Sequence, residues 1–570
     1  MTEAGGGRTI GRLWRDAVGA GRSSPAYLVE GSDGWHEVSW EEAGRAVDEI
    51  ANGLLALGVH KGDAFGILAQ TSLEWSLFDY ALALTGAVGA AIYANSSAKD
   101  CKYVIEHSDA VGVLVEDEEQ RAKIAGLGLP HAISFAELDD LRARGREFAA
   151  ANPTALAEAE AAIDEDDLFT FIYTSGTTGP PKACMIRHRN YYEMAACIER
   201  VEGFAVFDDT MLLYLPLAHN FGRLMHLLGG FIGFTLAFCP DPLRVAEALP
   251  AVRPTILPSV PRLYEKVHTA LVSQFEQTQG VRRRLLDWAL RTGRQASTYR
   301  QRGASLPRGL ALRHTVADRL VYRKVKNRLG GRLRLGVSGG APLAKEIGEL
   351  FHALDITIIE GWGLTECTTA AAVNRPNRLR FGTVGLPLPG FEVRTAEDGE
   401  LLIRSPTIFA GYYKDEEATR EVLGEDGWLH SGDLGEIDED GFIRITDRKK
   451  DIIVTAGGKN VAPQNLENAL KLAPLVSQAL VVGDRRRYVA ALITVDPAVA
   501  EGLSPGQVQE RVQKIVDEAN SDLSRFEQIK RFAILPREFS AEEDEVTPTL
   551  KLKRRVCAEH FAAEIEELYA

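Results

Sequence analysis

The chain has 570 residues, 45% of them hydrophobic, and a formal net charge of −15. This length predicts two or more domains, the composition is that of an ordinary globular protein, and the negative charge argues against nucleic acid as the main partner. The six cysteines form no C-x-x-C pair, which argues against a zinc site or a disulfide scaffold and favours a reducing cytosol.

The N-terminal sequence MTEAGGGRTIGRLWRDAVGA lacks the apolar core of a signal peptide. The most apolar run, Leu227 to Cys239, is shorter than the ~20 residues needed to span a bilayer. We therefore expect a cytoplasmic protein. Strand-like runs alternate with helical patterns along the chain, which indicates an α/β fold.

The stretch YTSGTTGPPK, from Tyr173 to Lys182, is rich in hydroxyls and in glycine backbone amides, groups that bind phosphate oxygens. It does not fit the P-loop pattern, in which a glycine-rich loop opens directly into a helix. Here Leu168 to Tyr173 predicts a buried strand before the loop, Lys182 to Arg187 a second strand after it, and Asn190 to Val201 a helix. A polyphosphate site is favoured over a plain surface turn.

The segment His219 to Phe238 mixes four glycines with large apolar residues. These glycines could open an apolar tunnel beside a helix, or they could allow a buried helix to pack closely. The tunnel interpretation makes His219 and Gly222 candidate substrate-binding residues.

Residues 281–336 contain sixteen Lys and Arg against only Asp287 and Asp318. This region is either a solvated helical face or a basic patch that meets anionic lipid headgroups or a phosphorylated cofactor. The second interpretation predicts peripheral contact with a membrane, for example with its inner face.

Two further strands, Leu333 to Ser338 and Ile356 to Glu360, each end in a glycine-rich turn. Ligands bind at such carboxyl ends in open α/β sheets. Trp362, between two glycines, is predicted to be exposed on a tight turn as a stacking platform for a nucleobase, although a lone Trp is more often in the core. Glu366, which follows, could hold Mg²⁺, a cation that prefers oxygen ligands.

From about residue 447 the sequence changes character, and we predict a small C-terminal domain joined by a short link near Lys450. Before the link, Asp433 is predicted in a turn where its carboxylate could accept both ribose hydroxyls, with Arg448 at the end of a strand nearby; an ordinary hairpin is the alternative. Near the C-terminus, TPTLKLKRR (Thr547 to Arg555) is either a projecting basic arm or a solvated tail.

Together these stretches resemble the adenylate-forming superfamily of acyl-CoA synthetases, luciferases and carrier-protein-loading domains. The resemblance covers nearly the whole chain in the family's order, including LPLAHNFGR, RPTILPSVPRLYEKV, VSGGAPL, EGWGLTE, SGDLG and DRKKDIIVTAGGKNVAPQNLE. The segments RLYEKV and TPTLKLKRR are most similar to the long-chain fatty acyl-CoA synthetase branch. The family implies an N-terminal AMP- and acyl-binding α/β domain (1–447) and a small mobile α+β C-terminal domain (448–570).

The resemblance also implies roles for individual residues. Lys551 would be the catalytic lysine, with Lys553 as its rival, and Lys450 the hinge. Thr365 would contact the α-phosphate, and Thr174 and Glu366 would lie at magnesium. The remaining contacts would be to the β- and γ-phosphates (Thr174, Ser175, Gly176, Thr177, Thr178, Gly179, Lys182), to adenine (Gly340, Ala341, Glu360, Gly361, Trp362), to ribose (Asp433, Arg448) and, after domain rotation, near the thiol substrate (Gly457, Gly458).

The activity so implied is ATP- and Mg²⁺-dependent activation of a fatty acid to acyl-AMP, followed by transfer to coenzyme A. Ala183 and Leu550 stand where many relatives have glycine, which leaves the charged groups intact. Alternatives are a ligase that loads a carrier-protein thiol, another carboxylic acid–CoA ligase, or a non-catalytic nucleotide- or lipid-binding regulator on the same fold. A regulator would be expected to have lost catalytic charges. This chain retains all five of them: Lys182, Glu366, Asp433, Arg448 and Lys551.

Overall fold

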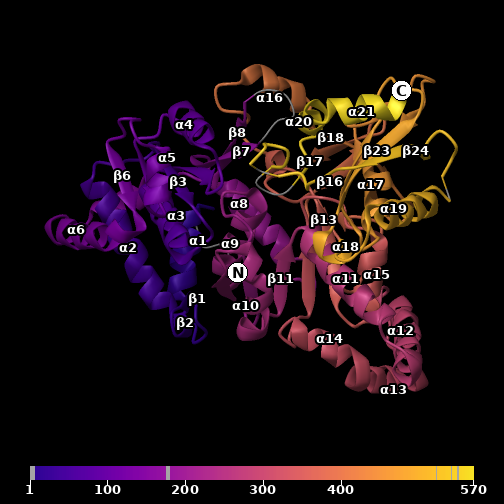
Figure 1. The fold of residues 1–570 in the computed structure, drawn as a ribbon. Coiled ribbons are helices and arrows are strands. Elements are labelled where there is room, and N and C mark those ends of the chain that lie inside the picture. Colours follow the sequence, from indigo (N-terminus) through magenta and orange to yellow (C-terminus); the bar gives the residue numbers. More distant parts are fainter. Residues whose placement is uncertain (1–6, 175–179, 522, 541, 548–550) are drawn as a thin grey trace.

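The structure, a computed structural model, describes residues 7–174, 180–521, 523–540, 542–547 and 551–570. Figure 1 shows two α/β layers side by side, with the last part of the chain resting above the second layer. None of the helices in these ranges is long and apolar enough to cross a bilayer.

The first sheet has the strand order β6-β5-β3-β4-β7-β8 and is parallel except for the last pair. Strand β7, next to the edge strand β8, is rich in aromatic and β-branched residues, which suit a buried strand. The strands are β3 (Ala64–Ala69), β4 (Val88–Tyr93), β5 (Gly112–Val115), β6 (His131–Ser134), β7 (Leu168–Thr174) and β8 (Lys182–Arg187). The helices before β7 are α1 (Ile10–Gly19), α2 (Trp40–Ala56), α3 (Leu73–Thr85), α4 (Ala98–His107), α5 (Glu118–Lys123), α6 (Leu138–Ala151) and α7 (Ala155–Ala161), with the short turn η1 (Phe135–Glu137).

The second sheet has the order β15-β14-β13-β12-β11-β9-β10-β1-β2, and the strands from β13 to β1 run parallel. The carboxyl ends of β12 and β13, with the glycine-rich turns noted in the sequence, therefore lie next to each other. The strands are β1 (Tyr27–Gly31), β2 (Gly34–Val38), β9 (Thr210–Leu213), β10 (Thr235–Phe238), β11 (Ile256–Ser259), β12 (Leu335–Ser338), β13 (Thr357–Trp362), β14 (Ala372–Val373) and β15 (Leu386–Pro387).

Helices α8 (His188–Glu199) and α9 (Asn220–Ile232) pack between the two sheets and share one hydrophobic core with both. A fully buried ion pair fixes α9 against α3, since the Arg223 guanidinium bonds the Asp79 carboxylate and donates to Thr170 Oγ1 of β7 at 2.6 Å. Helix α9 ends at Gly233, whose φ of 96° is a left-handed cap that glycine adopts without strain. Three further elements border this layer: α10 (Val245–Val252), η2 (Pro242–Arg244) and α15 (Lys345–Ala353).

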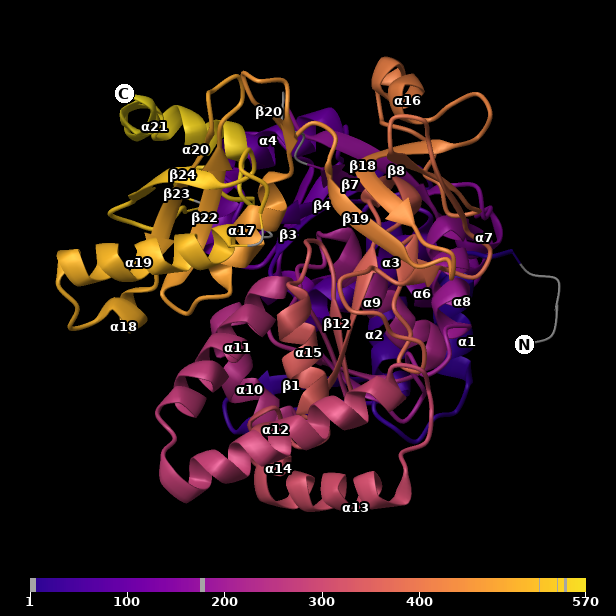
Figure 2. The same cartoon turned by 90° about the vertical axis from the view of Figure 1, so that its right-hand side faces the viewer.

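A helical arm extends from the second layer, at the bottom of Figures 1 and 2. It consists of α12 (Gly280–Arg300), α13 (Arg308–Ala317), a π-helical turn (Asp318–Tyr322) and α14 (Arg323–Arg328), and α11 (Pro261–Glu276) leads into it. The basic region 281–336 is thus mainly helical, as predicted.

A third, antiparallel sheet has the order β16-β17-β18-β19 and leads into the C-terminal part. Its strands are β16 (Glu392–Thr395), β17 (Glu400–Arg404), β18 (Leu429–Ile437) and β19 (Ile443–Arg448), with α16 (Glu416–Val422) before β18. The rest of the chain forms β20 (Ile453–Val454), β21 (Asn460–Val461), α17 (Pro463–Lys471), β22 (Val476–Val482), β23 (Val489–Val495), α18 (Pro497–Ala500), α19 (Pro505–Asn520), β24 (Ile529–Ile534), α20 (Arg554–His560) and α21 (Ala562–Tyr569).

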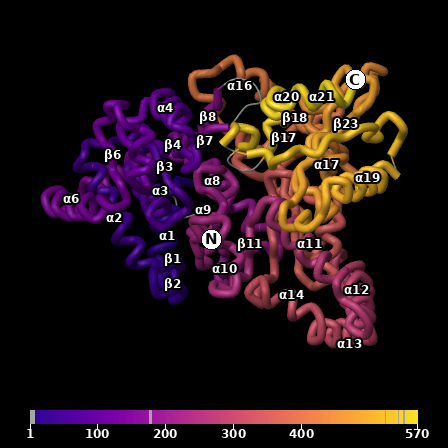
Figure 3. Tube along the Cα trace, viewed as in Figure 1, coloured from indigo at the N-terminus to yellow at the C-terminus, as the bar shows by residue number. Residues whose placement is uncertain are grey.

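Figure 3 shows this last segment as a body of its own above α11, and its apolar residues form separate clusters. It contacts α11 through Arg262, which donates to the Ser477 carbonyl at 2.6 Å and to Ser477 Oγ at 2.7 Å. Lys471 and Glu265 form a second bridge at 3.3 Å. The division at residues 447 and 448 remains a prediction.

Candidate functional site

The loop that the sequence singled out joins β7 to β8, so it is bounded by strands as predicted. Thr174 and Lys182 are partners in this antiparallel pair, and Thr174 Oγ1 donates to the Lys182 carbonyl at 3.4 Å. The pairing places both residues at the base of the loop. The predicted phosphate contacts Ser175, Gly176, Thr177, Thr178 and Gly179 lie outside the described residues.

Tyr412 connects the base of this loop to Glu366, a connection that the sequence did not reveal. An isolated β-bridge to Cys184 of β8 holds Tyr412 in place. Its ring lies under the Lys182 ammonium, 5.1 Å away, and its hydroxyl donates to Glu366 Oε1 at 2.5 Å. Burial and the Glu366 charge raise the Tyr412 pKa, so the hydroxyl keeps its proton and orients the carboxylate.

The ends of β12 and β13 carry the residues predicted to hold adenine. Gly340 has a φ of 84°, and both it and Ala341 are exposed at the end of β12. On β13, burial raises the pKa of Glu360 to about 8, although its Oε2 accepts from the Leu343 amide at 3.2 Å. Glu360 therefore carries a proton at neutral pH and offers an O–H donor beside this edge.

The prediction of an exposed Trp362 is wrong. Strand β13 continues through Gly361 and Trp362, because both pair with β14, and only 8% of the Trp362 surface is exposed. Its Nε1 donates to Asp433 Oδ2 at 2.7 Å. The indole thus positions a carboxylate, and its predicted role as an open stacking platform has no support in this arrangement.

Asp433 lies within β18, which corrects its predicted place in a turn. It is paired with Arg448 of β19, and Arg448 Nε lies 3.0 Å from Asp433 Oδ1. Both carboxylate oxygens of this buried residue are therefore engaged, one by Trp362 and one by Arg448. The arrangement brings the two predicted ribose residues together and adds Trp362 to them.

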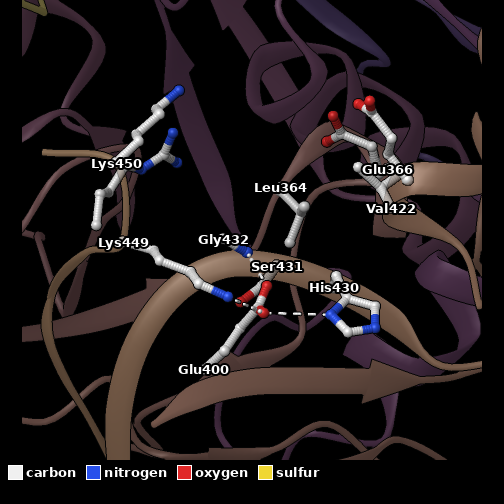
Figure 4. Close-up of a pocket in the computed structure, with 11 residues that line it drawn as sticks. Leu364, Glu366, Glu400, Val422, His430, Ser431, Gly432, Lys449 and Lys450 are labelled. Carbon is white, nitrogen blue, oxygen red and sulfur yellow. Dashed lines mark hydrogen bonds and ion pairs between the residues drawn. The ribbon is translucent and has the colours of Figure 1, made fainter. Parts of the chain in front are cut away.

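A pocket of about 420 Å³ opens next to this pair (Figure 4). Lys450, the predicted hinge residue, and Glu366, the predicted magnesium ligand, both line it. Below them, Glu400 accepts from His430 Nδ1 at 3.2 Å and from Lys449 at 3.1 Å. Burial and the nearby Arg448 lower the pKa of Lys450, which lies at this pocket among both acidic and basic side chains.

The position of Lys551 favours it over Lys553 as the catalytic lysine. Lys553 is held in an ion pair with Asp544. Lys551 is an exposed residue, yet the protein around its side chain partly desolvates it, and this desolvation, with the charges of Arg448 and Lys450, lowers its pKa to about 8. The attraction of Asp433 opposes the shift without cancelling it.

The described residues around Lys551 are tied to the C-terminal part, which argues against a free arm and a solvated tail, and residues 548–550 lie outside the described ranges. Val546 and Leu552 form a β-bridge, and the Lys551 amide donates to Thr547 Oγ1 at 3.0 Å. The neighbouring Arg554 is largely buried and lies 2.6 Å from Glu467 of α17. These contacts fix the backbone from which Lys551 projects.

His219 lies at the same site, whereas the glycines beside it serve packing. His219 Nδ1 accepts from the Phe221 amide at 3.2 Å, and burial, with the Lys551 charge, lowers its pKa to about 3, so it stays neutral. A Cβ on Gly222 would lie 2.3 Å from the Pro216 carbonyl oxygen, and one on Gly229 would lie 2.6 Å from Leu236. Gly230 is equally crowded by Tyr80, and the structure therefore supports the close-packed helix and gives these glycines no tunnel.

Thr365 and the C-terminal glycines complete the predicted set. Thr365 begins a short 3₁₀ turn, η4 (Thr365–Cys367), and its carbonyl accepts from Asn220 Nδ2 at 3.4 Å. Gly457 and Gly458 form the turn between β20 and β21, and a Cβ on either would meet no atom within 4 Å. This turn has the open backbone that a narrow substrate arm would need.

Within the described ranges, no cluster of three or more His, Cys, Asp or Glu side chains could hold a metal by itself. Mg²⁺ commonly binds one or two carboxylates together with substrate phosphates and water. Glu366 fits this mode, because Tyr412 occupies only its Oε1 and the residue faces the pocket.

Comparisons with known proteins agree with this geometry. The family model described as AMP-binding enzyme matches residues 14–413, and the model of the AMP-binding enzyme C-terminal domain matches residues 450–570. The long-chain-fatty-acid–CoA ligase FadD15 of Mycobacterium tuberculosis is 38% identical over 96% of this chain and 95% of its own length. The peroxisomal long chain acyl-CoA synthetase 7 of Arabidopsis thaliana is 31% identical over 94% of this chain and 82% of its own length.

Among solved structures, the adenylation domain of a carboxylate reductase from Mycobacterium chelonae has the same fold, with a TM-score of 0.79 at 23% identity. The match covers 100% of this chain and 92% of that one. Since the family models and the curated relatives together span almost the whole sequence, the chain belongs to the AMP-binding enzyme family, within the adenylate-forming superfamily.

Proposed function

We propose that the chain is a long-chain fatty acid–CoA ligase that forms AMP. The observation that carries the proposal is the convergence of Lys551, Arg448 and Asp433, from the C-terminal part and β18–β19, on the end of the second sheet. The ligase names of relatives that align over the full length support the choice of substrate and acceptor.

In the first half-reaction, a fatty acid carboxylate oxygen attacks the α-phosphorus of ATP, and pyrophosphate leaves. The repulsion between two anions opposes this approach, so cationic groups must surround the phosphates. Lys182 would bind the β- and γ-phosphates, and Lys551 would neutralise charge at the α-phosphate as the bond to pyrophosphate breaks. The protein's part is positioning and electrostatic stabilisation, with no covalent enzyme intermediate.

The nucleoside would be held at the edge formed by β13 and β18. Asp433, oriented by Trp362 and Arg448, would accept hydrogen bonds from the ribose hydroxyls. The protonated Glu360 would offer a donor to the base. Bound Mg²⁺ would lower the negative charge of the phosphates, with Glu366 and Thr174 as its protein ligands.

In the second half-reaction, the thiol of coenzyme A attacks the acyl carbonyl, and AMP leaves. The region held by Lys551 must then admit the thiol, which a rotation of the C-terminal part about Lys450 would allow. The open turn at Gly457 and Gly458 would approach the site in that state.

The test is pyrophosphate release by the purified chain with ATP, MgCl₂ and a panel of carboxylates that includes palmitate. We expect release with long-chain acids and, after addition of coenzyme A, an acyl-CoA product in the mass spectrum. If the acyl group were transferred only to a holo carrier protein, the carrier protein and not coenzyme A would be the acceptor. Failure to release pyrophosphate with every acid in the panel would overturn the proposal.

A further inference from the structure

The outer face of α13 exposes apolar side chains that no described element covers. Leu312 is 68% exposed, Val316 41% and Leu320, in the π-helical turn that follows, 42%. Because these residues are four apart, they lie on one side of a helix and form a continuous ridge. The opposite side of the same helix is buried through Leu310 and Ala317.

Arginines border the ridge on both sides. At 100° per residue, Arg308 and Arg319 fall on one flank and Arg313 on the other, and all three are exposed. The two acids of the region 281–336 offer little opposing charge, since Asp287 pairs with Arg283 at 3.0 Å and Asp318 with Lys326 at 2.7 Å. The face is therefore both apolar and strongly positive.

A shallow pocket of about 610 Å³ between α12 and α13 lies beside this face. Two exposed arginines, Arg294 and Arg313, line it together with Tyr299. This combination of guanidinium groups and an aromatic ring suits a phosphate-bearing headgroup.

We propose that this face, defined as α13 and the π-helical turn with the adjoining pocket, docks the enzyme on an anionic lipid surface. Leu312, Val316 and Leu320 would enter the interface, and the flanking arginines would meet headgroup phosphates. The apolar ridge favours lipid over nucleic acid, which offers no apolar phase to receive it. Since the whole chain carries −15, attraction to an anionic surface requires a local positive face such as this one.

The position of the face supports docking, because the arm protrudes at the bottom of Figures 1 and 2, opposite the C-terminal part. Contact there would leave the C-terminal part free to rotate. The proposal concerns surface chemistry alone, so it stands or falls independently of the substrate proposed above.

The first test is co-sedimentation with phosphatidylcholine vesicles that contain or lack phosphatidylglycerol, at roughly 30% so that the surface is clearly negative. We expect binding only to the anionic vesicles and loss of binding at high salt. The triple variant Leu312→Ser, Val316→Ser, Leu320→Ser should bind at least about tenfold more weakly. The matched control changes Val206, Phe207 and Leu243 to Ser, which are 51%, 61% and 84% exposed elsewhere, and should bind as the parent does.

The charge component is tested with Arg308→Gln, Arg313→Gln, Arg319→Gln against Arg45→Gln, Arg144→Gln, Arg420→Gln, which remove the same charge from exposed positions elsewhere. About fivefold loss per headgroup contact predicts about a hundredfold loss for the first set and little for the second. Equal losses in both sets, or equal binding to neutral vesicles, would overturn the proposal. So would tighter binding of the parent to duplex DNA than to anionic vesicles.

A labelled thiol locates the contact directly. All six native cysteines are buried, so Leu312→Cys introduces an accessible thiol for an environment-sensitive fluorophore. Anionic vesicles should shift its emission to the blue, whereas a label at Leu243→Cys should not respond. A response at Leu243 with none at Leu312 would place the contact elsewhere and refute this face.

Discussion

The ammonium of Lys551 is prepared to receive negative charge. The protein around its side chain partly desolvates it and its neighbours Arg448 and Lys450 repel it, so its pKa falls to about 8 in the absence of nucleotide. A phosphate in the site would supply the missing counter-charge. Bound nucleotide would therefore relieve the repulsion among these cations, and this relief favours binding of the polyphosphate.

Replacement of Lys551 tests its role against that of its neighbour. Lys551→Gln should lower the rate of adenylate formation by ~10²–10³, the usual effect of losing one donor to transition-state charge. Lys553→Gln should change it by less than about threefold, because Lys553 pairs with Asp544. Pyrophosphate release in a single turnover measures both. A larger loss in Lys553→Gln would exchange the two assignments.

The lowered pKa also predicts a pH dependence. Lys551 is charged below its pKa of about 8 and neutral above it, so kcat/KM for ATP should fall as pH rises through about 8 in the free enzyme. Lys551→Arg keeps its charge throughout this range and should remove the alkaline decline, at whatever rate it supports. A decline that persists unchanged in Lys551→Arg would assign the titration to another group.

At the scale of elements, the sequence predicts β7 and β8 well because both are apolar runs that are bounded by polar, glycine or proline residues. It misplaces Trp362 because flanking glycines signal a turn locally, whereas pairing with β14 extends the strand. Likewise, no local sequence pattern indicates that Tyr412 contacts both Lys182 and Glu366, because these contacts depend on the β-bridge between Tyr412 and β8. Motifs therefore point to the residues predicted to touch ligands, whereas the residues that orient them, such as Tyr412, depend on tertiary pairing.

The glycines of α9 show the same limit. A glycine-rich apolar helix can border a cavity or pack closely, and the two cases have one sequence pattern. Only the positions of Pro216 and Leu236 decide between them, and they fill the space.

The link after β19 is the element that would have to move in the proposed second half-reaction. The Lys449 amide bonds the Gly432 carbonyl at 2.9 Å and the Asp451 amide bonds Arg448 at 3.0 Å, while Lys450 lies between these anchors. Lys450→Pro fixes φ at this point and restricts the preceding residue. We expect adenylate formation to persist and acyl-CoA formation to fall at least about tenfold, as measured by single-turnover assays of each step.

Lys450→Ala is the matched control, because it removes the ammonium from the pocket but leaves the backbone free. It should affect adenylate formation more than thioester formation. If Lys450→Pro slowed both half-steps equally, the link would not act as the hinge.

For the whole molecule, the observed orientation of the C-terminal part is the one that brings Lys551 to Arg448 and Asp433. Its contacts with α11 include those of Arg262 with Ser477, a 3.6 Å approach of Arg262 to Glu538, and the Lys471–Glu265 bridge. Leu472 adds an apolar contact with the main core. Interfaces between domains with such polar contacts commonly allow relative motion.

Arg262→Ala should therefore shift the population away from this orientation. Hydrogen bonds from a charged group stabilise by about 1.5–3 kcal/mol, and partial exposure here places the loss near the lower figure, or roughly tenfold in the equilibrium. Adenylate formation should slow by up to that factor, while thioester formation from preformed acyl-AMP should be unchanged or faster. Arg308→Ala, on the distant arm, serves as the control in the same rapid-quench assays. Equal slowing of both half-steps by Arg262→Ala would mean that the contact supports the fold of α11 and does not select the adenylating orientation.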